Sequence, residues 1–426
     1  MQDTSSEVRG STSGWCAFLV LVLIACTLAS ACTCDANEQG HLLAPPGGDL
    51  SHGPAVRQHY DLEIVSQCGS HGLQGNEPKL FTRRPYLQRV DSSSATIVWT
   101  SASDALVLSV EGPGGSDAQR RAPVVDTSAA PQDAVQYLGE LSGLTPGSVY
   151  CYSLHREDDD SAVFRGGFRT APNADATVRF SAFGDLGKDS PDQHAVLRSL
   201  QSVDSEFLLV MGDVAYDRGT LAQLESHFFA VYAEYLALVP VFPATGNHDY
   251  ATDLAAAFRE AFVLPLHDVD EGHERWYSFD WGPVHVAVLD TEVLLEQQAA
   301  WLRDDMQASE LPWKIVSLHK PPYSSGGHGS EAEVQDVLVP VFVETNVDLV
   351  LAGHDHHYER SHQVDGVHYV VSGGGGRGTR PVGSSDFTAY AARVAHFVYL
   401  VADPTTLHLH AIDGTGQEFD TLKLEH

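Results

Sequence analysis

The stretch GHDHHYER, residues 353–360, directly follows the apolar run VDLVLA at 347–352. The run has the length and composition of a buried strand. Three histidines and two carboxylates then lie within eight residues. Imidazole and carboxylate at a strand end are typical metal ligands, but histidine is also an ordinary surface residue, and this chain has 22 of them. The rest of the sequence decides between the two interpretations.

Polar residues follow four other apolar runs in the same way. VRFSAF (178–183) precedes GDLG, EFLLVM (206–211) precedes GDVAY, PVFPAT (240–245) precedes GNHD, and KIVSLH (314–319) ends on a histidine. Helical patterns lie between several of these runs, which indicates an α/β domain with buried strands. In an open α/β sheet the carboxyl ends of the strands converge on one crevice. Four of the polar residues follow a glycine, which permits a tight turn or a close approach.

The candidate ligands are oxygen and nitrogen donors without a thiolate, a set that suits hard or borderline cations. They exceed what a single ion needs, and they suit two ions about 3.5–4 Å apart that share a carboxylate, a common arrangement for phosphoester hydrolysis. Turn residues and capped strand ends explain any one of these motifs, but not five in order. The candidates are Asp185, Asp213, Tyr216, Asn247, His319, His354 and His356.

Residues 79–172 have a different, all-β pattern. Ile97 and Trp99 alternate after a polar turn cluster, and LSGLTPGSVYCYSL (141–154) places a tyrosine to fold back on its own turn. This resembles the fibronectin type III sandwich, with Tyr150 as the corner tyrosine. Without clustered histidines or carboxylates at ligand spacing, the segment is interpreted as a spacer or rim.

The series GDLG, GDVAY, GNHD, VSLH and GHDH resembles the calcineurin-like metallophosphoesterases. Tyr216, the YER at 358–360 and the preceding β-sandwich resemble the purple acid phosphatases in particular. The resemblance covers 79–426. It implies a fibronectin type III-like sandwich at 79–172 and a four-layer αββα metallophosphoesterase domain at 176–426. It also implies an acid phosphatase that hydrolyses phosphate monoesters by direct attack of a metal-bound hydroxide.

The resemblance also implies how the ligands divide between two ions. Fe(III) is assigned to Asp185, Tyr216 and His356, because phenolate is a hard anionic donor whose charge-transfer colour names the family. A divalent iron, zinc or manganese ion is assigned to Asn247, His319 and His354, and Asp213 bridges both ions.

Three further residues receive catalytic roles from the resemblance. His248 is expected to contact the phosphoryl group, and Asp249 to fix its tautomer. His328, on the Gly-rich loop 323–331, is expected to bind the substrate and to protonate the leaving group; a solvent-exposed loop residue is the alternative. His357 is interpreted as a packed or supporting residue, and 358–360 as holding the loop.

The glycine tract GGGGRG at 373–378 lacks the Lys-Ser/Thr of a P-loop. We therefore interpret it as a turn between core strands rather than as a phosphate cradle.

The first 32 residues are typical of an export signal. WCAFLVLVLIACTLASAC (15–32) is apolar and ends in small residues, although Arg9 is the only basic residue before it. LIAC and LASAC resemble lipoprotein boxes, which makes Cys32 the favoured lipidation site and a simply cleaved signal the alternative. The protein is then lipid-anchored in a bacterial cell envelope or secreted. Residues 33–78 have the composition of a flexible tether.

Export implies an oxidising compartment, in which cysteines pair. Cys34, Cys68 and Cys151 remain after cleavage at Cys32. A Cys68–Cys151 disulfide can attach the tether to the outside of a strand, and two free thiols are the alternative.

The charge of the chain restricts its partners. The 57 acidic and 25 basic residues give a formal charge of −32, which argues against a nucleic-acid-binding surface. A small phosphoester remains the expected substrate, and an acidic protein with an anionic substrate needs local positive charge. Two alternatives stay open: a phosphodiesterase, or nucleotide or phospholipid head-group hydrolase, on the same metal site, and a non-catalytic surface adhesion protein.

Overall fold

The computed structural model describes residues 62–74, 80–101, 106–113, 116–121, 124–126, 134–157, 161–265 and 275–426. They all lie in the unit Leu42–His426. The predicted signal peptide and lipid site at 1–32 and most of the predicted tether fall outside these residues. Among the described residues, no helix is long and apolar enough to cross a membrane.

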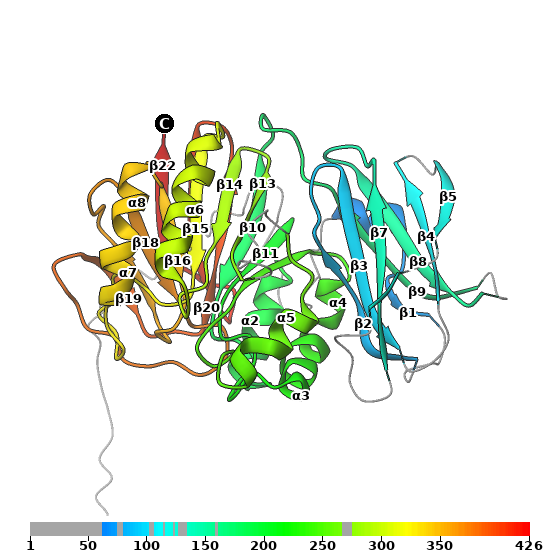
Figure 1. Ribbon diagram of the computed structural model, residues 1–426, viewed down its shortest axis with the longest axis horizontal. Helices are drawn as coiled ribbons and strands as arrows, with labels where there is room; N and C mark the ends of the chain where they lie inside the picture. Colours follow the sequence, from blue (N-terminus) through cyan, green and yellow to red (C-terminus); the bar gives the residue numbers. More distant parts are fainter. Residues whose placement is uncertain are drawn as a thin grey trace, which may run out of the picture. The chain divides into compact units, whose positions relative to one another are not determined.

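The N-terminal part is rich in β-sheet (Figure 1). A five-stranded sheet has the order β1-β9-β8-β4-β5, and a four-stranded sheet has the order β2-β3-β7-β6. Its elements are α1 (Leu62–Cys68), β1 (Gly72–Leu73), β2 (Phe81–Gln88), β3 (Ser94–Ser101), β4 (Val107–Gly112), β5 (Ser116–Arg121), β6 (Val124–Asp126), β7 (Val135–Ser142), β8 (Val149–His155) and β9 (Ala162–Arg169).

Two details of this part follow the sequence. The hydroxyl of Tyr150 accepts a hydrogen bond of 2.9 Å from the backbone N–H of Thr145, so the tyrosine does fold back on its turn. Cys68 and Cys151 form a disulfide with a Cα–Cα distance of 5.3 Å, which confirms the predicted pairing. The bridge joins the end of α1 to β8, and both α1 and β1 lie within the 33–78 segment that was predicted as a tether.

The remaining strands form two further sheets. A six-stranded sheet has the order β12-β11-β10-β20-β21-β22, and a seven-stranded sheet has the order β13-β14-β15-β16-β18-β17-β19. Their strands are β10 (Val178–Phe183), β11 (Phe207–Met211), β12 (Val241–Ala244), β13 (Tyr277–Trp281), β14 (Val284–Val288), β15 (Trp313–Leu318), β16 (Leu349–Ala352), β17 (Tyr358–Ser361), β18 (His368–Ser372), β19 (Thr388–Ala392), β20 (His396–Ala402), β21 (Thr406–Asp413) and β22 (Glu418–Glu425).

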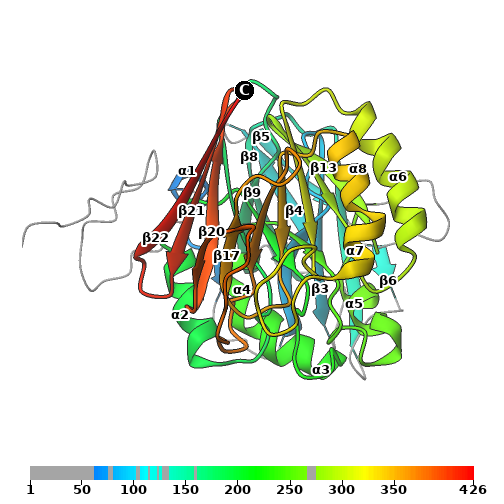
Figure 2. The ribbon, with the colours of Figure 1, turned by 90° about the vertical axis from the view of Figure 1, so that its left-hand side faces the viewer.

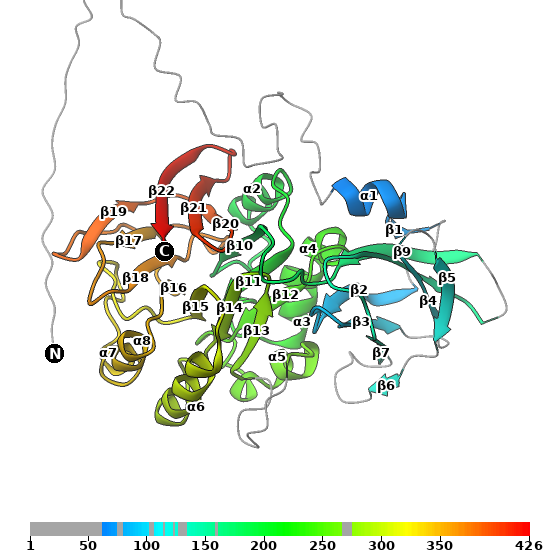
Figure 3. The ribbon, with the colours of Figure 1, turned by 90° about the horizontal axis from the view of Figure 1, so that it is seen from above.

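Helices flank the two sheets, which lie between α2 on one side and α6–α8 on the other (Figures 2 and 3). The helices are α2 (Pro191–Leu200), α3 (Leu221–Gln223), the π-helix η1 (Leu224–Phe229), α4 (Ala230–Leu236), the 3₁₀-helix η2 (Asp253–Ala255), α5 (Ala256–Ala261), α6 (Leu295–Ala308), α7 (Ala332–Val337) and α8 (Val339–Glu344). The helical segment from Leu221 to Leu236 is therefore divided, with the π-helix η1 between α3 and α4.

Alternating side chains in the central strands explain this layering. In β15, Ile315 belongs to the core shared with the six-stranded sheet, whereas Val316 and Leu318 pack in a second core with α6–α8. Leu351 and Val350 of β16 divide in the same way. Because successive side chains point to opposite faces, a strand that is buried on both faces reads as a continuous apolar run.

Candidate metal centre

All seven predicted ligands lie just beyond the carboxyl ends of strands, and they come from both sheets. β10, β11 and β12 of the six-stranded sheet lead into Asp185, into Asp213 and Tyr216, and into Asn247. β15 and β16 of the seven-stranded sheet lead into His319, and into His354 and His356.

Three donors form one compact group. The hydroxyl of Tyr216 donates a 2.7 Å hydrogen bond to Oδ1 of Asp185 and lies 3.3 Å from Nε2 of His356. The same His356 nitrogen is 3.4 Å from Asp185 Oδ1. All three side chains are buried. This group contains the residues that the sequence assigns to the first ion.

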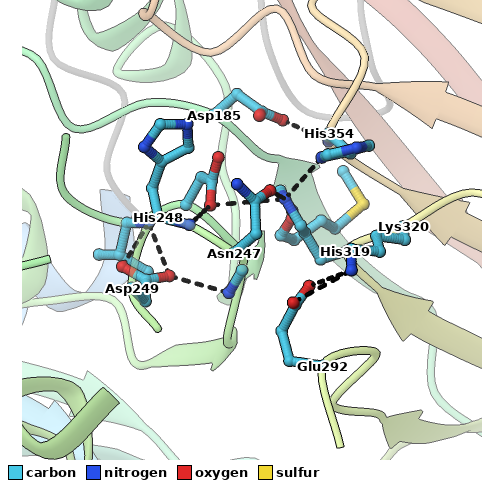
Figure 4. A network of polar contacts seen from close by, with 12 residues as sticks. Asp185, Asn247, His248, Asp249, Glu292, His319, Lys320 and His354 are labelled. Carbon is cyan, nitrogen blue, oxygen red and sulfur yellow. Dashed lines mark hydrogen bonds and ion pairs between the residues drawn. The ribbon is translucent and has the colours of Figure 1, made fainter. Parts of the chain in front are cut away.

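Four donors form a second group around Nε2 of His319. Oδ1 of Asn247 and Nδ1 of His354 each lie 3.2 Å from that nitrogen, and Oδ1 of Asp213 lies 3.4 Å from it. On the other side of the ring, Nδ1 of His319 lies 2.8 Å from the carbonyl oxygen of Met211 and donates to it. Figure 4 labels Asn247, His319 and His354 of this group. It contains the residues that the sequence assigns to the second ion, together with the predicted bridging carboxylate.

The two groups are contiguous. One possible ligand atom each from Asp185, Asp213 and His319 lie within 4.8 Å of one another. Because Nδ1 of His319 is bound to a carbonyl, its Nε2 faces the surrounding donor atoms, and all of them converge on the same small space. Such a convergence needs a positive charge to hold it, so the donor chemistry fits metal ions.

The pKa shifts at the site follow from burial and from neighbouring charges. Burial would raise the pKa of Asp185, but the hydrogen bond and charge of His356 and the charge of His319 lower it to about 2. Burial and the neighbouring His319 lower the pKa of His354 to about 2. A charged carboxylate and a neutral imidazole are the forms that metal ligands take.

Glycines make room for these donors. A Cβ on Gly212 would lie 2.5 Å from Nδ1 of His319, one on Gly246 would lie 2.3 Å from Oδ1 of Asp213, and one on Gly353 would lie 2.8 Å from Oδ2 of Asp185. The glycine before each polar residue is therefore required by close approach, as its position in the sequence indicates.

His248 lies beside the first group, with its ring centroid 4.5 Å from that of Tyr216. Its Nδ1 is 2.7 Å from the carbonyl oxygen of Asp217, which sets the tautomer and leaves Nε2 available. This corrects the expectation that Asp249 fixes the His248 tautomer. The buried carboxylate of Asp249 instead accepts hydrogen bonds from the backbone N–H groups of Gly246 (2.9 Å) and Val214 (3.2 Å), and so it holds two of the ligand loops (Figure 4).

His328 is exposed and covers the second group. Its ring centroid lies 4.2 Å from that of His354. Its backbone N–H donates to Asp355 Oδ1 (3.0 Å), and its Nε2 contacts the guanidinium of Arg380. Asp355 was not among the predicted site residues; it stands between two ligand histidines in the sequence, and its buried carboxylate also accepts the Ser324 hydroxyl (2.5 Å).

The residues that follow the ligand histidines support their loop. His357 is fully buried, with Nε2 3.3 Å from Oε2 of Glu359. Glu359 accepts the backbone N–H of Ser325 (2.7 Å), which connects this loop to the loop of His328. Arg360 and the Tyr358 hydroxyl both donate to Asp420 on β22.

The glycine tract follows the core strand β18, but the next strand, β19, begins only at Thr388 and is not part of the core, and the tract also closes the site. A Cβ on Gly373 would lie 2.7 Å from Asp185 Oδ2, and the backbone N–H of Arg377 donates to the carbonyl oxygen of Asp185 (2.8 Å). The guanidinium of Arg377 stands 5.2 Å above the Tyr216 ring. Sequence reasoning missed Arg377 and Arg380, although the need for local positive charge was a signal for both.

Comparison with known proteins agrees with this geometry. Residues 178–358 match the calcineurin-like phosphoesterase family. Acid phosphatase type 7 of Homo sapiens is 28% identical over 343 residues, which cover 72% of this chain and 76% of that protein. Purple acid phosphatase 1 of Ipomoea batatas is 28% identical over 254 residues, covering 52% of this chain and 53% of that protein. An uncharacterised protein of Mycobacterium tuberculosis is 28% identical over 272 residues, so the chain spans about half the length of these last two relatives.

The fold has a close counterpart among solved structures. A purple acid phosphatase from yellow lupin (Lupinus luteus) seeds superposes with a TM-score of 0.71 at 21% identity, covering 81% of this chain and 75% of the lupin chain. The chain thus carries a calcineurin-like metallophosphoesterase domain and is related to the purple acid phosphatases.

Proposed function

We propose that this protein is an exported acid phosphatase that hydrolyses phosphate monoesters. The observation that carries the proposal is the pair of contiguous donor groups, one centred on the Tyr216 hydroxyl and one on His319 Nε2. The phosphoesterase domain and relatives named acid phosphatase support the choice of reaction.

We assign Fe(III) to the first group and a divalent iron, zinc or manganese ion to the second, with Asp213 bridging them. A phenol and a carboxylate are hard donors that suit a trivalent ion, and no sulfur donor is among the proposed ligands. When bound, two such ions polarise a phosphoryl group and lower the pKa of water, so that water can attack phosphorus directly.

The chain's own residues position the substrate. The Asp217 carbonyl holds the His248 imidazole so that Nε2 remains available for a phosphoryl oxygen. His328, whose Nε2 contacts the Arg380 guanidinium and whose ring lies 4.2 Å from that of His354, is assigned the role of protonating the leaving group.

The proposal includes the organisation of the chain. We assign 1–32 to an export signal with Cys32 as the lipid-bearing residue, 79–172 to a fibronectin type III-like domain and 176–426 to the phosphoesterase domain. The Cys68–Cys151 disulfide supports an oxidising compartment.

The decisive experiment compares an aryl phosphate monoester with the matching diester, using purified, metal-loaded protein from residue 35 onward. We expect a strong monoester preference at acidic pH. A diester preference would replace the monoesterase with a phosphodiesterase on the same metal site. No hydrolysis of either, with both ions present by elemental analysis, would refute the enzyme and favour the adhesion role.

A further inference from the structure

Among the described residues, Lys320, Arg377 and Arg380 lie beside the donor groups, and the first two are paired with carboxylates. Nζ of Lys320 lies 3.0 Å from the Glu292 carboxylate, and Arg377 lies 3.3 Å from Oδ1 of Asp217. Arg380 has no carboxylate partner within the described part of the chain, and its guanidinium meets the His328 imidazole.

Arg380 lies one imidazole ring away from the second donor group. It contacts Nε2 of His328, whose ring stands 4.2 Å from that of His354 and is tilted by 33°. His354 in turn lies 3.2 Å from His319. A guanidinium has five N–H donors, and the contact with His328 leaves several of them for a ligand. Arg380 is half-buried, so a bound anion would be partly shielded from water.

The backbone fixes both partners of this contact. The N–H of Arg380 donates to the carbonyl oxygen of His356 (2.8 Å), and the N–H of Gly383 donates to that of Ser325 (2.9 Å). Asp355 holds the other partner through the N–H of His328. These hydrogen bonds connect the loop of Arg380, the loop of His356 and the loop of His328. The backbone on each side of the Arg380–His328 contact is therefore held in place.

We propose that Arg380 and His328 form a subsite for a second anionic group of the substrate, beside the phosphoryl group that is cleaved. This inference rests on the proposed function. The planar guanidinium matches phosphate and carboxylate oxygens in pairs. The substrate class is thus phosphoesters or phosphoanhydrides whose leaving group carries its own negative charge. Inorganic pyrophosphate is the simplest: water forms one new P–O bond, the bridging P–O bond breaks, and the departing phosphate keeps the electron pair.

The test compares kcat/KM for pyrophosphate with kcat/KM for an aryl phosphate in the metal-loaded protein and in Arg380→Gln. Removing a charged hydrogen-bond donor should lower the pyrophosphate value about 10–100-fold more than the aryl phosphate value. The control is Arg393→Gln, which makes the same change in charge at an exposed arginine. Nε of Arg393 lies 3.3 Å from the hydroxyl of Thr379, the residue before Arg380. The control should keep the wild-type ratio of the two substrates.

A binding measurement gives a second readout. Calorimetric titration of methylenebisphosphonate, which is not hydrolysed, should show about 10–100-fold weaker binding to Arg380→Gln, with partial recovery in Arg380→Lys. Equal losses on both substrates, or unchanged bisphosphonate binding, would overturn the subsite. If Arg380→Gln does not fold, Arg380→Lys carries the same comparison. A wild-type protein that cleaves neither substrate would refute the proposed function, and the titration would still decide whether the subsite exists.

Discussion

The Tyr216 hydroxyl donates to Oδ1 of Asp185 at 2.7 Å, and Nε2 of His356 lies 3.4 Å or less from both oxygens. Burial and the charges of Asp185 and Asp213 raise the pKa of Tyr216, so the phenol keeps its proton unless a stronger cation takes the proton's place. The hydrogen-bonded pair therefore marks where we expect a trivalent ion.

Tyr216→Phe should abolish the visible absorption band of the iron-loaded protein, because only a phenolate can supply that charge-transfer transition. Absorption spectra after iron loading test this. Tyr399→Phe is the matched control, since it removes another tyrosine–aspartate hydrogen bond, 2.6 Å to Asp204, which precedes β11 whereas Tyr216 follows it. A band that persists in Tyr216→Phe would contradict the ferric assignment.

Asp213→Asn should lower both metal content and activity, because this carboxylate is assigned to both ions and also accepts the N–H of His248 (2.8 Å). We expect at least about a hundredfold loss of kcat/KM, since even residues that only support metal ligands are worth about 10–100-fold. Metal content per chain should be measured alongside. Asp189→Asn, at an exposed aspartate, should leave both unchanged; full metal occupancy in Asp213→Asn would exclude the bridging role.

His328→Ala should slow substrates with poor leaving groups more than substrates with good ones. The plot of log kcat against the leaving-group pKa should become steeper, because a proton donor matters most when the departing oxygen is basic. Normal hydrolysis of alkyl phosphates by this variant would remove His328 from the acid role.

The free energy of unfolding should fall as the pH rises from about 6.5 to about 9, the range in which His285 loses its proton. Burial lowers the pKa of this histidine, but hydrogen bonds and charges from Asp280 and Asp305 outweigh burial and raise it from 6.5 to about 9. The stabilisation is complete below about pH 6.5 and is lost as the pH approaches 9. It amounts to at most about 3 kcal/mol, and solvent around Asp280, whose side chain is 67% exposed, reduces it.

Urea unfolding at pH 6 and pH 10 measures this effect. The difference in unfolding free energy between the two pH values should be smaller in His285→Gln than in the wild-type protein. An equal difference in both proteins would place the pH dependence elsewhere.

Removing the disulfide should lower the unfolding free energy without changing kcat. Cys68 and Cys151 are 83 residues apart, and cross-links of this kind contribute about 2–4 kcal/mol. Urea unfolding of Cys68→Ser/Cys151→Ser should match that of the wild-type protein under reducing conditions. A lower kcat in the double variant would indicate that the N-terminal sheets influence the site.

The donor groups were predictable because one physical rule produces them. Strands buried on both faces read as apolar runs, and the residue after the glycine at each strand end lies at the same edge of its sheet. The support of the site was less predictable. The partner of His248 is a backbone carbonyl, and no sequence pattern indicates such a partner. Asp249 stands next to His248 in the sequence, but its carboxylate accepts backbone N–H groups instead. Asp355 stands between two ligands in the motif, yet only the fold shows that its carboxylate holds another loop.

Because the ligands are divided between the two sheets, metal binding would also hold the sheets together. Asp185, Asp213 and Asn247 follow strands of one sheet, whereas His319 and His354 follow strands of the other. Ions bound by ligands from both sheets would cross-link the two sheets where they face each other. A ligand that binds only the folded state stabilises it, so chelation of the ions should first destabilise the contact between these two sheets. Amide hydrogen exchange would then accelerate in β11 and β15, which belong to the two different sheets, before it accelerates in the N-terminal sheets.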